Sequence, residues 1–291
     1  VYADIAPAAA HALHMPSHIF LQLGMWLDVR NSNIDAYAAA RAVNEKYGLP
    51  EGREDFHTLS WLAYANLMLG QHEAAAEDLS NARAAVDRNP GSDRVMNGYL
   101  DMRGRHMIET GQWEAVGLAP VDSVEGRHGN WVAVVGMSAA HRGDMDGAKA
   151  AEARLRSLSE SAEAAGNQYD ARQNAILENQ VAAIRLLKSG DSDGAVAAAK
   201  NAAEMEVQYM RVPSGPPKPM KPANELYAQV LLEADRPEEA KAAFQQSLAW
   251  TPLRTPSMMG LAKAAEKTGD NETAHDMYTR LRTMPGAKLM D

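Results

Sequence analysis

The sequence contains no cysteine, only three phenylalanines and no long run of apolar residues. The absence of cysteine excludes disulfides, thiolate metal sites and a cysteine nucleophile, and it fits a cytoplasmic and a periplasmic protein equally. Aromatic and β-branched residues are scarce, whereas alanine, glutamate and leucine are abundant, which favours helices over strands. We therefore expect an all-α protein and leave its compartment open.

Positive charge is also scarce in this chain. Lys and Arg total 29 against 38 Asp and Glu, which gives a net charge of −9. An excess of negative charge disfavours binding to nucleic acid. No apolar run approaches the roughly 18 residues that a membrane-spanning helix needs. We expect a soluble chain that neither binds nucleic acid nor inserts into a membrane.

A glycine, a short polar stretch and then alanines recur along the sequence. In the clearest copies the alanines follow the glycine by five, eight and twelve residues, as in Gly190, Ala195, Ala198 and Ala202. Glycine permits a left-handed turn between two helices, and small residues let those helices approach closely. The predicted turns lie at Gly24, Gly70, Gly111, Gly143, Gly190, Asp235 and Gly269.

This pattern resembles the tetratricopeptide repeat, a pair of antiparallel helices with a period of 34 residues. The best copy, residues 231–252, has the small, aromatic and terminal proline positions of that family at Ala240, Phe244 and Pro252. Most steps between the turns differ from 34 residues, so longer helices or wider connections are expected. The resemblance implies an α-solenoid whose concave groove binds a peptide, a protein or a small ligand.

A proline-rich stretch from Val212 to Pro222 interrupts the helical pattern. Because proline lacks an amide hydrogen, this segment should be extended, as a rigid connection between two helices or as a ligand for a proline-binding partner. It divides the chain into helical repeats over residues 1–211, a connection over 212–222 and further repeats over 223–291.

The phrase His-Ala-Leu-His-Met-Pro-Ser-His-Ile-Phe spans residues 11–20, and a second histidine-bearing helix follows it. Both features, with Gly215-Pro-Pro before Glu225-Leu226, resemble a specific group of bacterial tetratricopeptide proteins. In that group an N-terminal region with its own histidines precedes the phrase. Since this chain starts at Val1 without a leader, we expect it to lack an N-terminal portion. The resemblance implies no biochemical activity.

Histidines are the strongest candidates for a functional site. His11, His14 and His18 have helical spacing, and His57 lies thirteen residues before Gly70 as His11 does before Gly24. If first helices line the groove, these four side chains converge there, and His106 extends the set through the third repeat. Such a set is typical of zinc or of another imidazole-binding transition metal.

Two features of the same phrase weaken the metal hypothesis. Pro16 breaks the helical hydrogen bonding and should turn His11 and His14 away from the common face. The phrase also lacks the glutamate of a His-Glu-x-x-His metalloprotease. Structural roles for the histidines, such as capping a helix or giving the groove a polar surface, stay open.

The same register places Tyr64 and Arg105 beside His18, because each lies six residues before its turn glycine. A row of these side chains suits an extended peptide or an anionic ligand. Two functions therefore remain: a scaffold that binds a ligand in its groove, or a metal-dependent hydrolase or oxidoreductase. The sequence has no phosphate-binding loop, serine nucleophile elbow or complete calcium loop that would favour another class.

Overall fold

The computed structural model describes residues 9–117, 129–210 and 213–288, and every regular element in these ranges is an α-helix. The all-α prediction is therefore confirmed. No described helix has the length and apolar character needed to cross a membrane. The helices are α2 (Ala10–His14), α3 (Ser17–Gln22), α4 (Trp26–Tyr47), α5 (Glu54–Met68), α6 (His72–Arg88), α7 (Asp93–Thr110), α9 (Gly129–His141), α10 (Met145–Ala164), α11 (Gln168–Lys188), α12 (Ser192–Tyr209), α13 (Ala223–Glu233), α14 (Pro237–Trp250), α15 (Thr255–Thr268) and α16 (Asn271–Thr283).

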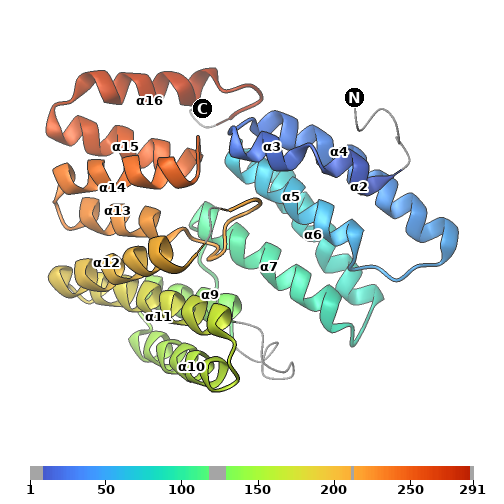
Figure 1. The fold of residues 1–291 in the computed structure, drawn as a ribbon, viewed down its shortest axis with the longest axis horizontal. Helices are drawn as coiled ribbons and strands as arrows, with labels where there is room; N and C mark the ends of the chain where they lie inside the picture. Colours follow the sequence, from blue (N-terminus) through green and yellow to red (C-terminus); the bar gives the residue numbers. More distant parts are fainter. Residues whose placement is uncertain (1–8, 118–128, 211–212, 289–291) are drawn as a thin grey trace.

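Successive helices pack against each other as antiparallel pairs, in the order of the chain (Figure 1). All the predicted turn residues have a left-handed backbone, including Asp235 with φ 57°. That aspartate replaces the usual glycine and keeps the register of the repeat. The unequal spacing of the turns has a simple cause, since α4 has 22 residues and α11 has 21.

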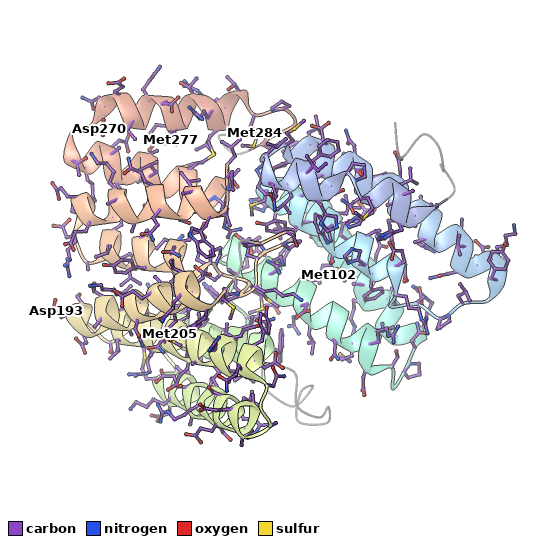
Figure 2. The ribbon with its side chains drawn as sticks, in the orientation of Figure 1. Met102, Asp193, Met205, Asp270, Met277 and Met284 are labelled. Atoms are coloured by element: carbon purple, nitrogen blue, oxygen red, sulfur yellow. The ribbon has the colours of Figure 1, made fainter. Side chains whose placement is uncertain are left out.

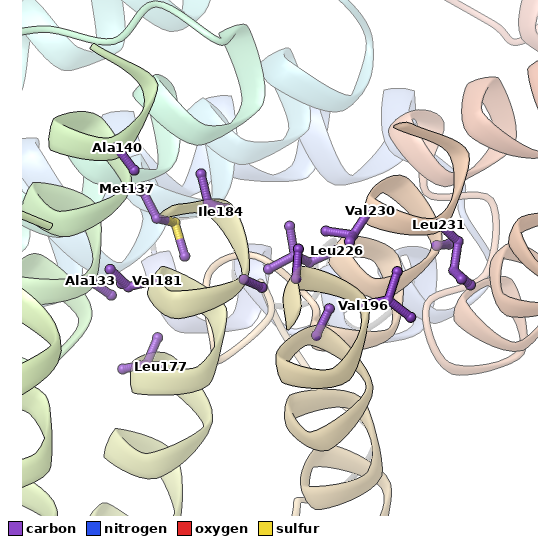
Figure 3. Packing of buried hydrophobic residues seen from close by; sticks show 14 of the residues in the cluster. Ala133, Met137, Ala140, Leu177, Val181, Ile184, Val196, Leu226, Val230 and Leu231 are labelled. Carbon is purple, nitrogen blue, oxygen red and sulfur yellow. The ribbon is translucent and has the colours of Figure 1, made fainter. Parts of the chain in front are cut away.

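Small side chains set the distance between helices in the middle of the array. Ala148, Ala195 and Ala199 are fully buried, and Val181 and Leu177 pack close to Met137 (Figure 3). A Cβ atom on Gly136 of α9 would come within 2.7 Å of Ala151 on α10 and of Val181 on α11. Glycine at this position lets three helices cross closely, which is what the recurrent small residues of the sequence predict.

The C-terminal helices return to the N-terminal ones, and the ends of the array lie side by side (Figure 1). The indole nitrogen of Trp26 donates to the carbonyl of Leu253 at 2.8 Å. The amide of Gln71 donates to Gly286 O, and the backbone nitrogen of Lys288 donates to Leu69 O, each at 2.7 Å. Each of these contacts joins residues more than 200 positions apart in the sequence, and together they close the solenoid on itself.

The proline-rich segment crosses the centre of this closed array on its way from α12 to α13 (Figure 1). Its described part, residues 213–222, contains no helix, as predicted; Val212 lies outside the described residues. Ser214 O and Pro217 O accept hydrogen bonds from side chains of α3 and α7. At its end, the carboxylate of Glu206 accepts from the backbone nitrogens of Ala223 and Asn224 and so caps α13.

Candidate functional site

A cavity of about 700 Å³ opens between the proline-rich segment and helices α3, α5, α7, α11 and α12. Met102 of α7, labelled in Figure 2, lies near the middle of the molecule and forms part of its wall. The volume is within the range of about 300–1,000 Å³ that is usual for small-molecule sites. The lining residues are His18, His57, Ser60, Trp61, Asp101, Met102, Arg105, Tyr169, Arg172, Tyr209, Met210, Pro213, Ser214, Gly215, Pro216 and Lys218.

Cations outnumber acidic groups on the described wall of this cavity, although the chain as a whole is acidic. Its lining contains three cations, Arg105, Arg172 and Lys218, and one carboxylate, that of Asp101. The Arg172 guanidinium lies 4.4 Å from the centre of the Tyr209 ring, a distance at which cation and ring attract each other. The cavity therefore offers positive charge and aromatic surface together.

Arg105 is the most deeply buried of these cations, with 9% of its surface exposed. Its Nη2 donates to Pro217 O at 3.1 Å, whereas its buried Nη1 has no hydrogen-bond partner among the described residues. Burial lowers the pKa of Arg105, while the nearby Tyr64 and Glu109 act in the opposite direction. A buried N–H group without a partner is costly, so a bound acceptor at this point would be favourable.

The histidine phrase lies beside the cavity, and His14 is its fully buried member. Asn33 donates through Nδ2 to Val29 O and to Ser17 Oγ, which leaves its Oδ1 facing His14 Nδ1 at 2.8 Å. Because an amide oxygen only accepts, His14 must carry its proton on Nδ1. Its Nε2 then has a free lone pair. Burial lowers the pKa of His14 to about 4, so the ring is neutral at pH 7.

His57 and His18 complete a group of three imidazoles around Trp61. The Nε2 atoms of His57 and His14 are 3.0 Å apart, and burial also lowers the pKa of His57. His18 lies with its ring centre 5.0 Å from that of His14, and its Nδ1 donates to Ser214 O at 2.7 Å. The ring centres of His14 and His18 are each 4.7 Å from Trp61.

Of the other two predicted metal ligands, His11 lies at the edge of this group, with its ring centre 6.4 Å from that of His14, and His106 lies on α7. The side chain of His11 is 68% exposed, and its Nδ1 lies 3.5 Å from Glu54 Oε1. His106 is half-buried on α7, and the charged neighbours that act on it are His72 and Glu114. The break at Pro16 separates α2, which carries both His11 and His14, from α3, which carries His18. His14 is nevertheless beside His18, so the expectation that Pro16 turns His14 away is wrong. Among the described residues, no group of three or more histidines and carboxylates is arranged to hold a metal ion.

Of the predicted row of His18, Tyr64 and Arg105, the last two are in contact, since the Arg105 guanidinium lies 5.2 Å from the centre of the Tyr64 ring. His18 and Arg105 line the main cavity, whereas Tyr64 lines a second cavity of about 210 Å³ with Trp26 and Trp250. Tyr64 is 1% exposed, and its hydroxyl accepts from Arg254 Nη1 at 2.9 Å. The returning C-terminal loop covers α5, which is why this tyrosine is not on the open surface of a groove.

A buried ionic cluster around Arg254 stands behind Tyr64. The Arg254 guanidinium donates to both oxygens of Glu109 at 2.7 and 2.8 Å and to both oxygens of Glu225 at 2.7 and 3.0 Å. Although burial opposes its ionisation, Arg254 and Lys221 hold the pKa of Glu225 well below the usual range. Glu109 belongs to the third repeat, so these ion pairs fix the C-terminal repeats to the wall that carries Arg105.

Sequence reasoning missed this ionic cluster and most of the cavity wall. Arg172, Tyr209 and Lys218 belong to elements far along the chain from His18, and nothing local marks them as its neighbours. For Arg254 the only signal was its position between Pro252 and Pro256, which indicates a loop but not a partner.

The comparisons with known proteins concern the fold. No family model and no curated protein matches this sequence. Among solved structures, a tetratricopeptide repeat protein from Parabacteroides merdae is similar, with a TM-score of 0.52 and 13% sequence identity. The match covers 95% of this chain and 93% of the other. Together with the paired helices and their turns, this similarity establishes that the chain has the tetratricopeptide-repeat fold.

Proposed function

We propose that this protein is a scaffold that binds a small anionic molecule in the central cavity. The observation that carries the proposal is the buried Arg105, which lines the cavity and whose Nη1 has no hydrogen-bond partner among the described residues. A carboxylate or phosphate oxygen is the acceptor that suits a guanidinium best. Arg172 and Lys218 add positive charge at the same cavity.

The size of the ligand follows from the proline-rich segment. In an open solenoid the concave side is long enough for an extended peptide. Here residues 213–216 and Lys218 line the cavity, and side chains of Gln22, His18 and Arg105 donate hydrogen bonds to carbonyl groups of the segment. The segment thus occupies backbone-binding positions that a peptide would use. What remains is a compartment for a small molecule, with Trp61, Tyr169 and Tyr209 offering aromatic surface to it.

The experiment compares an aromatic anion with a neutral molecule of the same shape. Benzoate and phenyl phosphate, with benzamide and benzyl alcohol as their neutral counterparts, are titrated into the protein by calorimetry. We expect the anions to bind and the neutral molecules to bind at least tenfold more weakly. Arg105→Met should weaken the anions by about 10- to 100-fold, because a hydrogen bond to a charged group contributes about 1.5–3 kcal/mol.

Arg156→Met is the matched control, since Arg156 is exposed and pairs with Glu178 away from the cavity. Its affinity for the anions should equal that of the parent protein. Equal binding of anions and neutral molecules, or unchanged binding in Arg105→Met, would contradict the proposal. Preferential binding of an acidic peptide over the small anions would also contradict it, because the segment would then have to leave the groove.

The alternative function is a metal-dependent hydrolase or oxidoreductase with zinc or another transition metal. A catalytic centre of that kind needs three protein ligands and an open position. Among the described residues the histidines converge, but no set of three is arranged around a common point. The binding scaffold is therefore the function that the geometry supports best.

A further inference from the structure

A pair of imidazole nitrogens, one from the histidine phrase and one from α5, is a feature that the proposed anion binding does not use. His14 belongs to α2 and His57 to α5, and their Nε2 atoms meet 3.0 Å apart. The rings are arranged edge to face, with their centres 4.5 Å apart and 71° between their planes, and the two Nε2 atoms form a hydrogen bond.

The hydrogen bond to Asn33 fixes which nitrogen of His14 carries the proton. Its Nδ1 must carry the proton because Asn33 presents only an oxygen there, so its Nε2 always offers a lone pair. Metal-binding histidines usually donate their second nitrogen to a carbonyl or carboxylate oxygen in this way, which sets the ring orientation. His18 follows the same rule, since its Nδ1 donates to Ser214 O.

The separation of the two nitrogens selects among metals. With metal–nitrogen bonds of about 2.0–2.1 Å, two ligands at a right angle lie about 2.9 Å apart, and two ligands in a tetrahedron lie about 3.3 Å apart. The observed 3.0 Å is the ordinary length of an N–H···N hydrogen bond, and it is also near the right-angle value, so two imidazoles at a right angle need little movement to bind the ion. Square-planar and tetragonal sites with nitrogen ligands favour Cu²⁺ and Ni²⁺, and copper binds imidazole more tightly than zinc does.

We infer that His14 and His57 together bind one divalent transition-metal ion that accepts imidazoles at a right angle, Cu²⁺ or Ni²⁺, at the wall of the central cavity. His57 lines that cavity, so the remaining coordination positions face it and take water or an anionic ligand. In the metal-free protein His57 Nε2 donates its proton to His14 Nε2. On binding, that proton leaves His57 Nε2, and both lone pairs turn to the ion.

The test titrates the purified chain with CuCl₂ and with NiCl₂ at pH 7.5, with glycine as a competing ligand for copper. We expect one ion per chain and a Cu²⁺ electron paramagnetic resonance spectrum with hyperfine coupling to imidazole nitrogens. His57→Asn should lower the affinity at least tenfold and remove part of that coupling. His14→Gln should do the same, but because His14 is fully buried, His57→Asn carries the test.

His275→Asn is the matched control, since His275 is an exposed histidine on α16 and does not line the cavity. It should bind both metals as the parent does, and circular dichroism should report the same helix content for all variants. The inference is overturned if neither metal binds stoichiometrically, or if binding and spectrum are unchanged in His57→Asn. Because the readout needs no organic ligand, failure of the anion-binding proposal leaves this test intact.

Discussion

Two regions of the molecule hold their helices together in different ways. Between α9 and α12 the interior is apolar and built from small residues, with alanines and Gly136 at the crossings. At the centre, where α5, α7 and α13 meet the loop before α15, the interior contains Arg254, Glu109 and Glu225. The first region joins neighbours in the sequence, and the second joins residues 29 to 190 positions apart.

The comparison shows that apolar packing between neighbouring helices forms the repeats, whereas ion pairs between distant repeats hold together the walls of the cavity. Close packing of neighbouring helices gives a solenoid of any length, because each unit contacts only the next. The ionic cluster acts across units and fixes the curvature at which the array closes. A buried ion pair adds little net stability over apolar residues, but its geometry is demanding and it is intolerant of a missing partner.

The largest expected loss of stability comes from the ionic cluster around Arg254. Arg254→Met leaves Glu109 and Glu225 buried without their guanidinium, which should lower the free energy of unfolding by about 3–5 kcal/mol. Urea unfolding followed by circular dichroism measures the loss. Adding Glu109→Gln to the same chain should recover part of it, because Glu109 is then uncharged while Glu225 keeps its ion pair with Lys221. A loss below that of an exposed pair such as Arg156–Glu178 would show that the cluster is not what closes the array.

In the apolar region, Gly136→Val should lower the free energy of unfolding by about 3 kcal/mol, because the added methyl groups overlap with Ala151 and Val181. Thermal unfolding gives the change, and Lys149→Val, on the exposed face of α10, is the control for the β-branched residue itself. Since none of the described cavity-lining residues belongs to α9 or α10, the folded variant should keep its affinity for the anion. Loss of binding would mean that the two regions are coupled.

Asp78 tests a buried polar contact in the N-terminal part. It is 7% exposed and accepts from Asn66 Nδ2 at 2.7 Å, and burial raises its pKa to about 7. The folded state thus binds a proton that the unfolded chain releases above about pH 4, so this residue makes stability fall as the pH rises from about 4 to about 7.

Asp78→Asn keeps the acceptor and removes the titration. We expect a gain of about 2 kcal/mol in the free energy of unfolding at pH 8, and a much smaller gain at pH 4.5. Urea unfolding at the two pH values measures both. Glu77→Gln, on the exposed face of the same helix, should give no such pH-dependent gain. An equal effect of Asp78→Asn at both pH values would contradict the buried titration.

The smallest effect is expected at a helix cap of the regular repeats. Asp191 accepts from Gly194 N at 2.9 Å at the start of α12, so Asp191→Ala should cost about 1 kcal/mol. Thermal unfolding again measures the change. Asp193→Ala, two residues further on in the first turn of α12, is the comparison, because it leaves this cap hydrogen bond in place. If both changes cost the same, general charge near the helix N-terminus would explain the loss better than the cap.

Much of the fold could be predicted because its signals are local. The turn at Asp235, for example, followed from alanine spacing alone, and its backbone is left-handed as the register requires. The site was harder to predict. The sequence predicted that His11, His14, His18 and His57 converge, and the structure brings His14 close to His18 and His57. His11 is on the same helix as His14, but its side chain is exposed. Tyr64 shares the register of His18 but lies beneath the returning loop.

The sequence by itself determined the helices, their turns and the pairing of neighbours, because each of these depends on residues within about one repeat length of each other. Only the tertiary structure decided that the array closes, that residues 213–216 and Lys218 line a cavity instead of leaving an open groove, and that Arg105 has a buried nitrogen in need of an acceptor. The physical reason is that closure depends on contacts such as Arg254 with Tyr64, 190 positions apart. No local periodicity records such a contact.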